Sequence, residues 1–257
     1  MVESWVVNGL RAGGCVFAEQ EAALLEEATG GATADLERLV ARRVAGEPLE
    51  YLLGWAEFQG LRIVVEPGVF VPRRRTEFLV ERARDVLPPG GVAVDLCCGS
   101  GAVAAALRHA RPDAVVHAAD LDPAAVRCAR RNLPARVYEG DLFAALPAAL
   151  RGTVDVVIAN VPYVPSAAIA TMPPEARDHE PAAALDGGAD GLAVLRRVAR
   201  AAPDWLAPGG HLLSETSETQ SGPAVEELRM AGFDAHAEAC DELSATAVIG
   251  RRTPDCG

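Results

Sequence analysis

The stretch that decides the fold is Val92-Ala-Val-Asp95-Leu-Cys-Cys-Gly99-Ser-Gly101-Ala, residues 92–102 of a 257-residue chain. Its apolar start predicts a buried strand, and its glycines predict a tight turn into a following helix. From there to residue 249 the expected helices and strands alternate. This alternation predicts an α/β fold built on a doubly wound parallel sheet, whose ligands bind beyond the carboxyl ends of the strands.

The elements after residue 90 follow this alternation. Strands are expected at 92–95, 115–119, 136–139, 154–159, 211–215, 235–238 and 245–249, and helices at 102–111, 123–132, 191–202 and 224–231. The chain before residue 90 has another pattern. Apolar residues at three- and four-residue spacings predict helices within 17–46, and the run 55–65 predicts a hairpin that turns at Gln59-Gly60. We therefore expect an N-terminal helical region (1–47), a hairpin linker (48–72) and a main domain (73–257).

Composition excludes several classes of protein. Half of the residues are apolar and 23% are charged, which excludes a disordered chain. The net charge of −12 argues against a protein whose main task is to hold a nucleic-acid backbone. No run approaches the roughly 18 apolar residues of a membrane span, and acidic Glu3 precedes the first apolar stretch without a basic partner. We expect a soluble, cytoplasmic protein.

The cysteines and histidines give no sign of a metal site. The six cysteines are Cys15, Cys97, Cys98, Cys128, Cys240 and Cys256. None forms a Cys-x-x-Cys pair, and the five histidines are scattered along the chain. Zinc sites are recognised by paired ligand spacing, so we expect no metal and reduced thiols.

The turn after the first strand favours a particular cofactor. Gly99 and Gly101 let the backbone approach a ligand closely, and the next helix offers free N–H groups. The pattern taken alone also fits a dinucleotide site. However, the carboxylate of Asp95 disfavours a pyrophosphate and favours a cation, such as the ammonium and sulfonium of S-adenosylmethionine.

Carboxylates also end the next two strands. Asp120, followed by Leu121, stands where a side chain accepts both hydrogen bonds of a ribose diol. Asp141 could accept a hydrogen bond from the adenine amino group, with Leu142 and Phe143 packing on the base. These residues complete a predicted S-adenosylmethionine site.

The fourth strand ends in Asn160-Val161-Pro162-Tyr163. The Asn160 side-chain oxygen and the Val161 carbonyl can accept both N–H bonds of a planar nitrogen, such as an amide or a base amine. Pro162 would fix the turn, and Tyr163 would stack on the planar group. This loop is therefore the candidate catalytic element, and Asn160 is also expected to border the cofactor.

At this point the chain resembles a class I S-adenosylmethionine methyltransferase, specifically the HemK-type protein-glutamine N-methyltransferases. These enzymes act on peptide release factors and on a ribosomal protein. The resemblance covers about 46–250 and is carried by Pro48-Leu49-x-Tyr51-Leu52-x-Gly54, Val71-Pro72-Arg73-x-x-Thr76-Glu77, the loop 95–101, Asn160-Val-Pro162-Tyr163, and Glu180-Pro181-x-x-Ala184-Leu185-x-Gly187-Gly188-x-Asp190-Gly191-Leu192.

The resemblance implies a Rossmann-like class I methyltransferase sheet and methyl transfer to a glutamine side-chain amide of a protein. It assigns Arg73, Glu180 and Pro181 to the substrate side of the site. The helical part before residue 46, which in this family helps to receive the protein substrate, is shorter than usual here.

The chain departs from the family pattern at three places. Val161 replaces the first proline of the Asn-Pro-Pro-Tyr signature, which keeps the carbonyl but reduces the rigidity. Cys97 replaces the first glycine of the cofactor loop, to which it is still assigned. Arg74-Arg75 stand in place of Pro-Asp and alter the charge near the cofactor entrance.

The sequence alone leaves other functions open. A second hypothesis keeps the cofactor but makes the acceptor a small molecule with a planar amine, amide or indole. A nucleic-acid base is a third, against which the net charge of −12 argues. A non-catalytic binding module and a nicotinamide dehydrogenase complete the alternatives, although nothing in the chain resembles a hydride-transfer acid or base.

Overall fold

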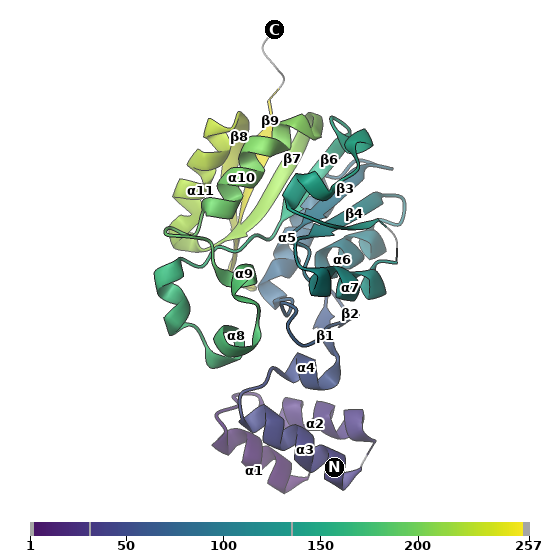
Figure 1. Ribbon diagram of the computed structural model, residues 1–257, viewed down its shortest axis with the longest axis vertical. Helices are drawn as coiled ribbons and strands as arrows, with labels where there is room; N and C mark the ends of the chain where they lie inside the picture. The colour runs from purple at the N-terminus through teal and green to yellow at the C-terminus, as the bar shows by residue number, and fades with distance from the viewer. Residues whose placement is uncertain (1–2, 31, 135, 254–257) are drawn as a thin grey trace.

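A seven-stranded sheet in the order β5-β4-β3-β6-β7-β9-β8 forms the centre of the computed structural model, which describes residues 3–30, 32–134 and 136–253 (Figure 1). Its strands are β3 (Val92–Leu96), β4 (Val115–Asp120), β5 (Val137–Glu139), β6 (Val154–Ala159), β7 (Leu206–Thr216), β8 (Phe233–Cys240) and β9 (Ala245–Arg252). Between residues 92 and 159 each expected strand and helix is confirmed to within one residue at its ends.

The sheet is parallel from β5 to β7, but β9 runs antiparallel to both of its neighbours. The expected doubly wound sheet is therefore confirmed as mostly parallel, with one antiparallel strand near this edge. The turn 241–244 between β8 and β9 is too short for the helical crossover that parallel strands need. The chain instead turns back and inserts β9 between β7 and β8.

Helices cover both faces of this sheet. One face carries α5 (Glu77–Val86), α6 (Ala102–Ala110) and α7 (Pro123–Asn132), and the other carries α10 (Ala193–Ala201) and α11 (Glu218–Met230). The apolar residues of β6 alternate between the two cores: Val156 and Ile158 face α5–α7, whereas Val157 and Ala159 face α10 and α11. Burial on both faces explains why β6 is a continuous apolar run.

The order of the strands places a crevice at the ends of β3 and β6. From β3 the chain proceeds outward to β4 and β5, and it returns to the other side of β3 with β6. The connections on either side of this switch point diverge and leave room beyond the carboxyl ends of the strands. The glycine turn, residues 97–101, directly follows β3, and the Asn160 loop, residues 160–163, directly follows β6.

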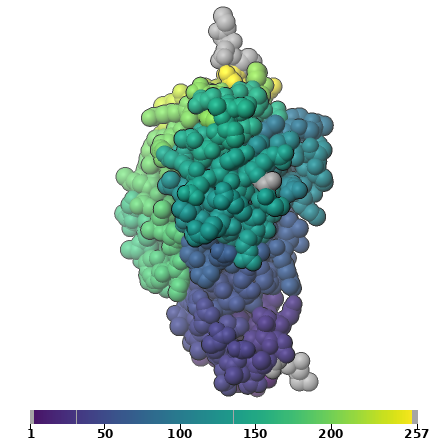
Figure 2. Space-filling view, turned by 45° about the vertical axis from the view of Figure 1, so that its right-hand side comes forward, coloured from purple at the N-terminus to yellow at the C-terminus, as the bar shows by residue number. Residues whose placement is uncertain are grey.

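The N-terminal helices form one end of the elongated molecule (Figures 1 and 2). They are α1 (Ser4–Ala12), α2 (Ala18–Thr29) and α3 (Thr33–Val44), and they share a core that includes Leu10, Leu25 and Leu36. The helices predicted within 17–46 are confirmed, whereas α1 was not expected. The short α4 (Leu49–Leu53) leads into the predicted hairpin of β1 (Trp55–Phe58) and β2 (Leu61–Val64), which turns at residues 59–60.

Short helices fill the connections, and the sequence did not predict them. They are the 3-10 helices η1 (Arg74–Thr76), η2 (Leu142–Ala145), η3 (Ala148–Leu150), η4 (Ser166–Thr171) and η5 (Ala202–Asp204), and the α-helices α8 (Pro174–His179) and α9 (Ala182–Leu185). The segment that holds η4, α8 and α9 extends from the sheet towards the N-terminal helices (Figure 1). There Glu175 of α8 pairs with Arg43 of α3 at 2.5 Å. Within the described ranges no helix is long and apolar enough to span a bilayer.

Candidate active site

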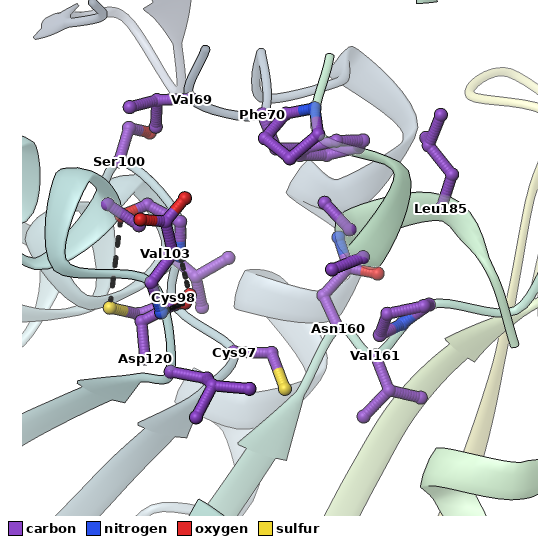
Figure 3. Close-up of a pocket in the computed structure, with 18 of the residues that line it drawn as sticks. Val69, Phe70, Cys97, Cys98, Ser100, Val103, Asp120, Asn160, Val161 and Leu185 are labelled. Atoms are coloured by element: carbon purple, nitrogen blue, oxygen red, sulfur yellow. Dashed lines mark hydrogen bonds between the residues drawn. The ribbon is translucent and has the colours of Figure 1, made fainter. Parts of the chain in front are cut away.

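A cavity of about 450 Å³ lies at the carboxyl ends of β3, β4 and β6. Figure 3 shows Cys97 between Asp120 and Asn160, with Phe70 on the opposite side of the cavity. Most of the predicted site residues line it: Arg73, Asp95, Cys97, Gly99, Asp120, Leu121, Asp141, Leu142, Asn160, Val161, Pro162, Tyr163 and Pro181. Gly101 and Glu180 are not in its wall.

The turn after β3 depends on left-handed backbone conformations. Cys97 has φ +56°, Gly99 +54° and Gly101 +77°. Gly101 caps α6, and a Cβ atom there would lie 3.1 Å from the Cβ of Ala129 on α7. Gly101 therefore permits close packing of α6 and α7 and leaves the cavity wall to its neighbours. Cys97 stands in the conformation that glycine adopts at no steric cost, which explains the family preference for glycine there.

The Asp95 carboxyl is almost fully buried and half satisfied. Its Oδ2 accepts a hydrogen bond from the Ala104 backbone N–H at 3.1 Å, while its Oδ1 is buried without a partner among the described residues. Burial raises the pKa of Asp95 to about 8. An unpaired buried oxygen in the wall of a cavity fits a ligand that brings a positive charge or a hydrogen-bond donor.

Asp120 is bound to the turn that it faces. Its Oδ2 accepts from the Gly99 backbone N–H at 2.8 Å, and its Oδ1 accepts from the Asp122 backbone N–H at 2.9 Å. Each oxygen retains a lone pair, so the carboxylate can still accept a pair of hydroxyls. Burial raises the pKa of Asp120 above its ordinary value.

The side of the cavity formed by the segment after β5 agrees only partly with the predicted adenine site. Asp141 Oδ2 accepts from Arg197 Nη2 at 2.5 Å, and both residues line the cavity. Leu142 also lines it. Phe143 is only 4% exposed and stacks on Trp205, with 5.5 Å between the ring centroids. The expectation that Phe143 packs on a base is therefore wrong, because η2 turns this side chain into the core.

The Asn160 loop presents an amide oxygen to the cavity. Asn160 Nδ2 donates a long hydrogen bond to Thr76 Oγ1, at 3.5 Å, and no hydrogen bond from the described residues reaches its Oδ1. Val161 and Pro162, which follow it, are buried and also line the cavity. The Val164 N–H donates to the Leu185 carbonyl at 3.1 Å, and the Gly187 N–H donates to the Val164 carbonyl at 2.8 Å. These bonds hold the loop although Val161 replaces a proline.

Tyr163 lies in a polar network that the sequence did not predict. Its hydroxyl donates to Glu215 Oε1 at 2.9 Å and accepts from Arg75 Nη2 at 2.8 Å. Glu215 stands near the end of β7 and also accepts from Thr76 Oγ1 at 2.6 Å. No local spacing could indicate these contacts, because Glu215 is 140 residues from Arg75. The only available signal was Glu215 itself, an acidic residue two positions after the apolar pair Leu212-Leu213 of β7.

Glu180 supports the wall from behind. Both of its carboxylate oxygens lie 2.7 Å from Arg73 Nη2, and Oε1 also accepts from the Val71 backbone N–H at 3.1 Å. Burial raises the pKa of Glu180. The structure thus joins Arg73 and Glu180, two of the residues that the resemblance assigned to the substrate side, and sets the neighbouring Pro181 into the wall.

No cluster of three or more potential metal ligands occurs among the described residues. The cysteines in this part of the chain are all free thiols, and Cys256 lies outside it. Burial raises the pKa of Cys97 far above its ordinary value, so this thiol stays protonated beside the neighbouring carboxyls.

The sheet order, the glycine turn and the three strand-end carboxylates define a class I methyltransferase. Residues 60–174 match the family model "Methyltransferase small domain". The release factor glutamine methyltransferase of Geobacter sulfurreducens is 40% identical over 83% of this chain and 76% of its own. The 4-amino-L-phenylalanine/4-methylamino-L-phenylalanine methyltransferase of Streptomyces pristinaespiralis is 39% identical over 81% and 75%.

The chain belongs to the release factor glutamine methyltransferase family. The S-adenosylmethionine-dependent methyltransferase predicted from its sequence is thereby confirmed. In fold, it is also similar to the crystal structure of a methyltransferase from Pyrococcus furiosus, with a TM-score of 0.58 and 19% identity over 83% of this chain and 98% of that one.

Proposed function

We propose that this enzyme methylates the side-chain amide nitrogen of a glutamine in a protein, and that its acceptor is a peptide release factor. The observation that carries the proposal is the unpaired Oδ1 of Asn160 in the cavity wall, beside the turn that the strand-end carboxylates surround. Relatives named as release factor glutamine methyltransferases support the choice of acceptor.

Three carboxyls fit the parts of S-adenosylmethionine. The unpaired Oδ1 of Asp95 fits the methionyl ammonium, and the remaining lone pairs of Asp120 fit the ribose hydroxyls. Asp141, whose Oδ1 is not engaged by Arg197, fits the adenine amino group, with Leu142 and Leu121 beside the ring. Cys97 and Gly99 would line the path between these groups.

Asn160 would orient the acceptor amide. Its Oδ1 and the Val161 carbonyl would each accept a hydrogen bond from one N–H of the acceptor amide. Pro162 and Tyr163 would define the slot for the planar group. When bound, S-adenosylmethionine supplies the methyl group: a nitrogen–carbon bond forms, the carbon–sulfur electron pair stays on sulfur, and the nitrogen then releases one proton to solvent. As positive charge develops on the nitrogen, its N–H groups become more acidic, so the hydrogen bonds that they donate to Asn160 Oδ1 and to the Val161 carbonyl strengthen. This stabilises the transition state.

The parts of the chain would divide the remaining work. The N-terminal helical region, 1–47, would receive the protein acceptor, the hairpin linker 48–72 would hold it beside the cavity, and the domain 73–257 would carry out the transfer. Arg73 and Pro181 would form the wall on the acceptor side, and Glu180 would hold Arg73 in place from behind. The enzyme would then work in the cytoplasm, where release factors act.

The test is methylation of a purified release factor with isotope-labelled S-adenosylmethionine, followed by peptide mass spectrometry. One labelled methyl group on a glutamine supports the proposal. Label on another residue type would refute glutamine as the acceptor. No label on any bacterial release factor would favour a small aromatic amine as the acceptor instead.

A second candidate acceptor is a small aromatic amine. It is favoured by the relative from Streptomyces pristinaespiralis and by a cavity rim that includes the apolar side chains Phe70, Met172 and Leu185. Steady-state kinetics on a release factor and on 4-amino-L-phenylalanine, compared as kcat/KM, separate the two candidates.

A further inference from the structure

The Glu215 carboxylate is a common acceptor for three side chains at the edge of the cavity. It is 4% exposed, and its Oε1 accepts from Tyr163 and from Arg75 Nε, both at 2.9 Å. Its Oε2 accepts from Thr76 Oγ1 at 2.6 Å. Three segments that are distant in the sequence therefore meet at one buried charge.

Arg75 closes this arrangement. The same guanidinium that pairs with Glu215 also donates from Nη2 to the Tyr163 hydroxyl at 2.8 Å, and its carbon lies 6.0 Å from the centroid of the Tyr163 ring. The hydroxyl thus donates to one charged group and accepts from another. Charge-assisted bonds on both sides fix the direction of the phenol and thereby the plane of its ring.

The network also extends to Asn160, the other residue proposed to contact the methyl acceptor. Thr76 donates to Glu215 and accepts from Asn160 Nδ2 at 3.5 Å. Because Nδ2 is directed towards Thr76, the opposite atom of the amide, Oδ1, points away from the network. The orientation of Asn160 and that of Tyr163 consequently depend on the same carboxylate.

We propose that Arg75 and Glu215 are positioning residues for methyl transfer, which act by fixing Tyr163 and Asn160 in the orientation that receives the acceptor. This inference rests on the proposed function in assigning the acceptor to those two residues. Arg75 does not serve as a free cation for an anionic acceptor, because Glu215 neutralises it within hydrogen-bond distance.

The size of the effect follows from the geometry. A misplacement of about 1 Å at a reacting group can cost on the order of 100-fold in rate. The Arg75 side chain is 44% exposed, so its removal leaves the core intact and takes away one of the two hydrogen-bond partners of the Tyr163 hydroxyl. We expect Arg75→Ala to lower kcat by roughly 10- to 100-fold, with acceptor KM and S-adenosylmethionine affinity nearly unchanged.

The experiment compares Arg75→Ala, Arg75→Lys and Glu215→Gln with Arg74→Ala, an exposed neighbour outside the cavity wall. Lysine cannot form both bonds of the guanidinium, so Arg75→Lys should recover only part of kcat. Guanidinium ion at a non-denaturing concentration should restore part of the rate of Arg75→Ala, while urea should not. A raised acceptor KM with normal kcat would overturn the proposal, because it would mean direct contact with the acceptor.

A second measurement is independent of the acceptor. Amide hydrogen exchange in the peptide covering 160–166 should be faster in Arg75→Ala than in wild type and unchanged in Arg74→Ala. If wild type methylates no glutamine while exchange rises in Arg75→Ala, the proposed function fails and the positioning of the loop stands. Unchanged exchange in Arg75→Ala overturns the inference whatever the acceptor.

Discussion

Asp120 accepts a hydrogen bond from the backbone N–H of Gly99 at 2.8 Å, and so joins the end of β4 to the glycine turn after β3. Asp120 therefore has two tasks: it offers lone pairs to the ribose and it fixes the turn that faces the methionyl part. We expect Asp120→Ala to weaken S-adenosylmethionine binding by roughly 10- to 100-fold or more. Titration calorimetry measures this change. Asp113→Asn, on the exposed loop at the opposite end of the sheet, is the control, and equal affinity in both variants would remove Asp120 from the site.

Cofactor affinity should rise with pH as Asp95 loses its proton. Burial raises the pKa of Asp95 to about 8, so the carboxyl is mostly protonated at pH 7 in the free enzyme. A bound ammonium favours the carboxylate, and binding therefore releases a proton below this pKa. Affinity should increase between about pH 6 and 8 and level off above the pKa, by at most tenfold for each pH unit.

Calorimetry in buffers of different ionisation enthalpy counts the released proton. Asp95→Asn is the matched control, since it keeps the shape and loses the titration, while any titration of the ligand itself is the same for both proteins. A pH dependence that is identical in wild type and Asp95→Asn would show that Asp95 does not face the ammonium.

Two glycine-related substitutions in the turn should change the stability of the fold by very different amounts. Gly101→Ala places a methyl group 3.1 Å from Ala129 Cβ in a left-handed conformation, so it should destabilise the fold by about 2 kcal/mol or more. Cys97→Gly removes the steric cost of φ +56° but adds flexibility to the unfolded chain, so it should change stability by less than about 1 kcal/mol. Urea unfolding of both variants tests the pair, and similar losses would contradict it.

Asn160→Ala should bind S-adenosylmethionine almost normally and turn over roughly 100- to 1000-fold more slowly, since it lacks a partner that binds more strongly in the transition state. Asn160→Asp should also be poor on an amide, but it retains an acceptor oxygen and should keep more activity on an aromatic amine. Single-turnover rates with both acceptors measure this difference. A rate for Asn160→Ala within about threefold of wild type would mean that the acceptor is held elsewhere.

The sequence predicted those parts of the protein that depend on local pattern. The strands and helices between 92 and 159 follow from periodicity and from turn residues. Sites at strand ends follow from the rule that parallel strands end at one edge, and this brought Asp95, Asp120 and Asn160 together. The resemblance added the acceptor-side wall, of which Arg73 and Pro181 line the cavity.

Contacts between distant segments could not be predicted in this way. Glu215 meets Arg75 across 140 residues, and Glu180 meets Arg73 across 107. The inward turn of Phe143 depends on a 3-10 helix that leaves no periodic pattern, and the position of β9 depends on a tight turn after β8. Each of these is decided by packing against a partner that the local sequence does not identify.

We propose that methyl transfer to a glutamine of a release factor takes place at the Asn160 loop. The most direct measurement is tandem mass spectrometry of a purified release factor after incubation with labelled S-adenosylmethionine and either wild type or Asn160→Ala. We predict one labelled methyl group on a glutamine side chain with wild type and almost none with Asn160→Ala. Equal labelling by the two proteins, or label that is absent from glutamine in both, would contradict the claim.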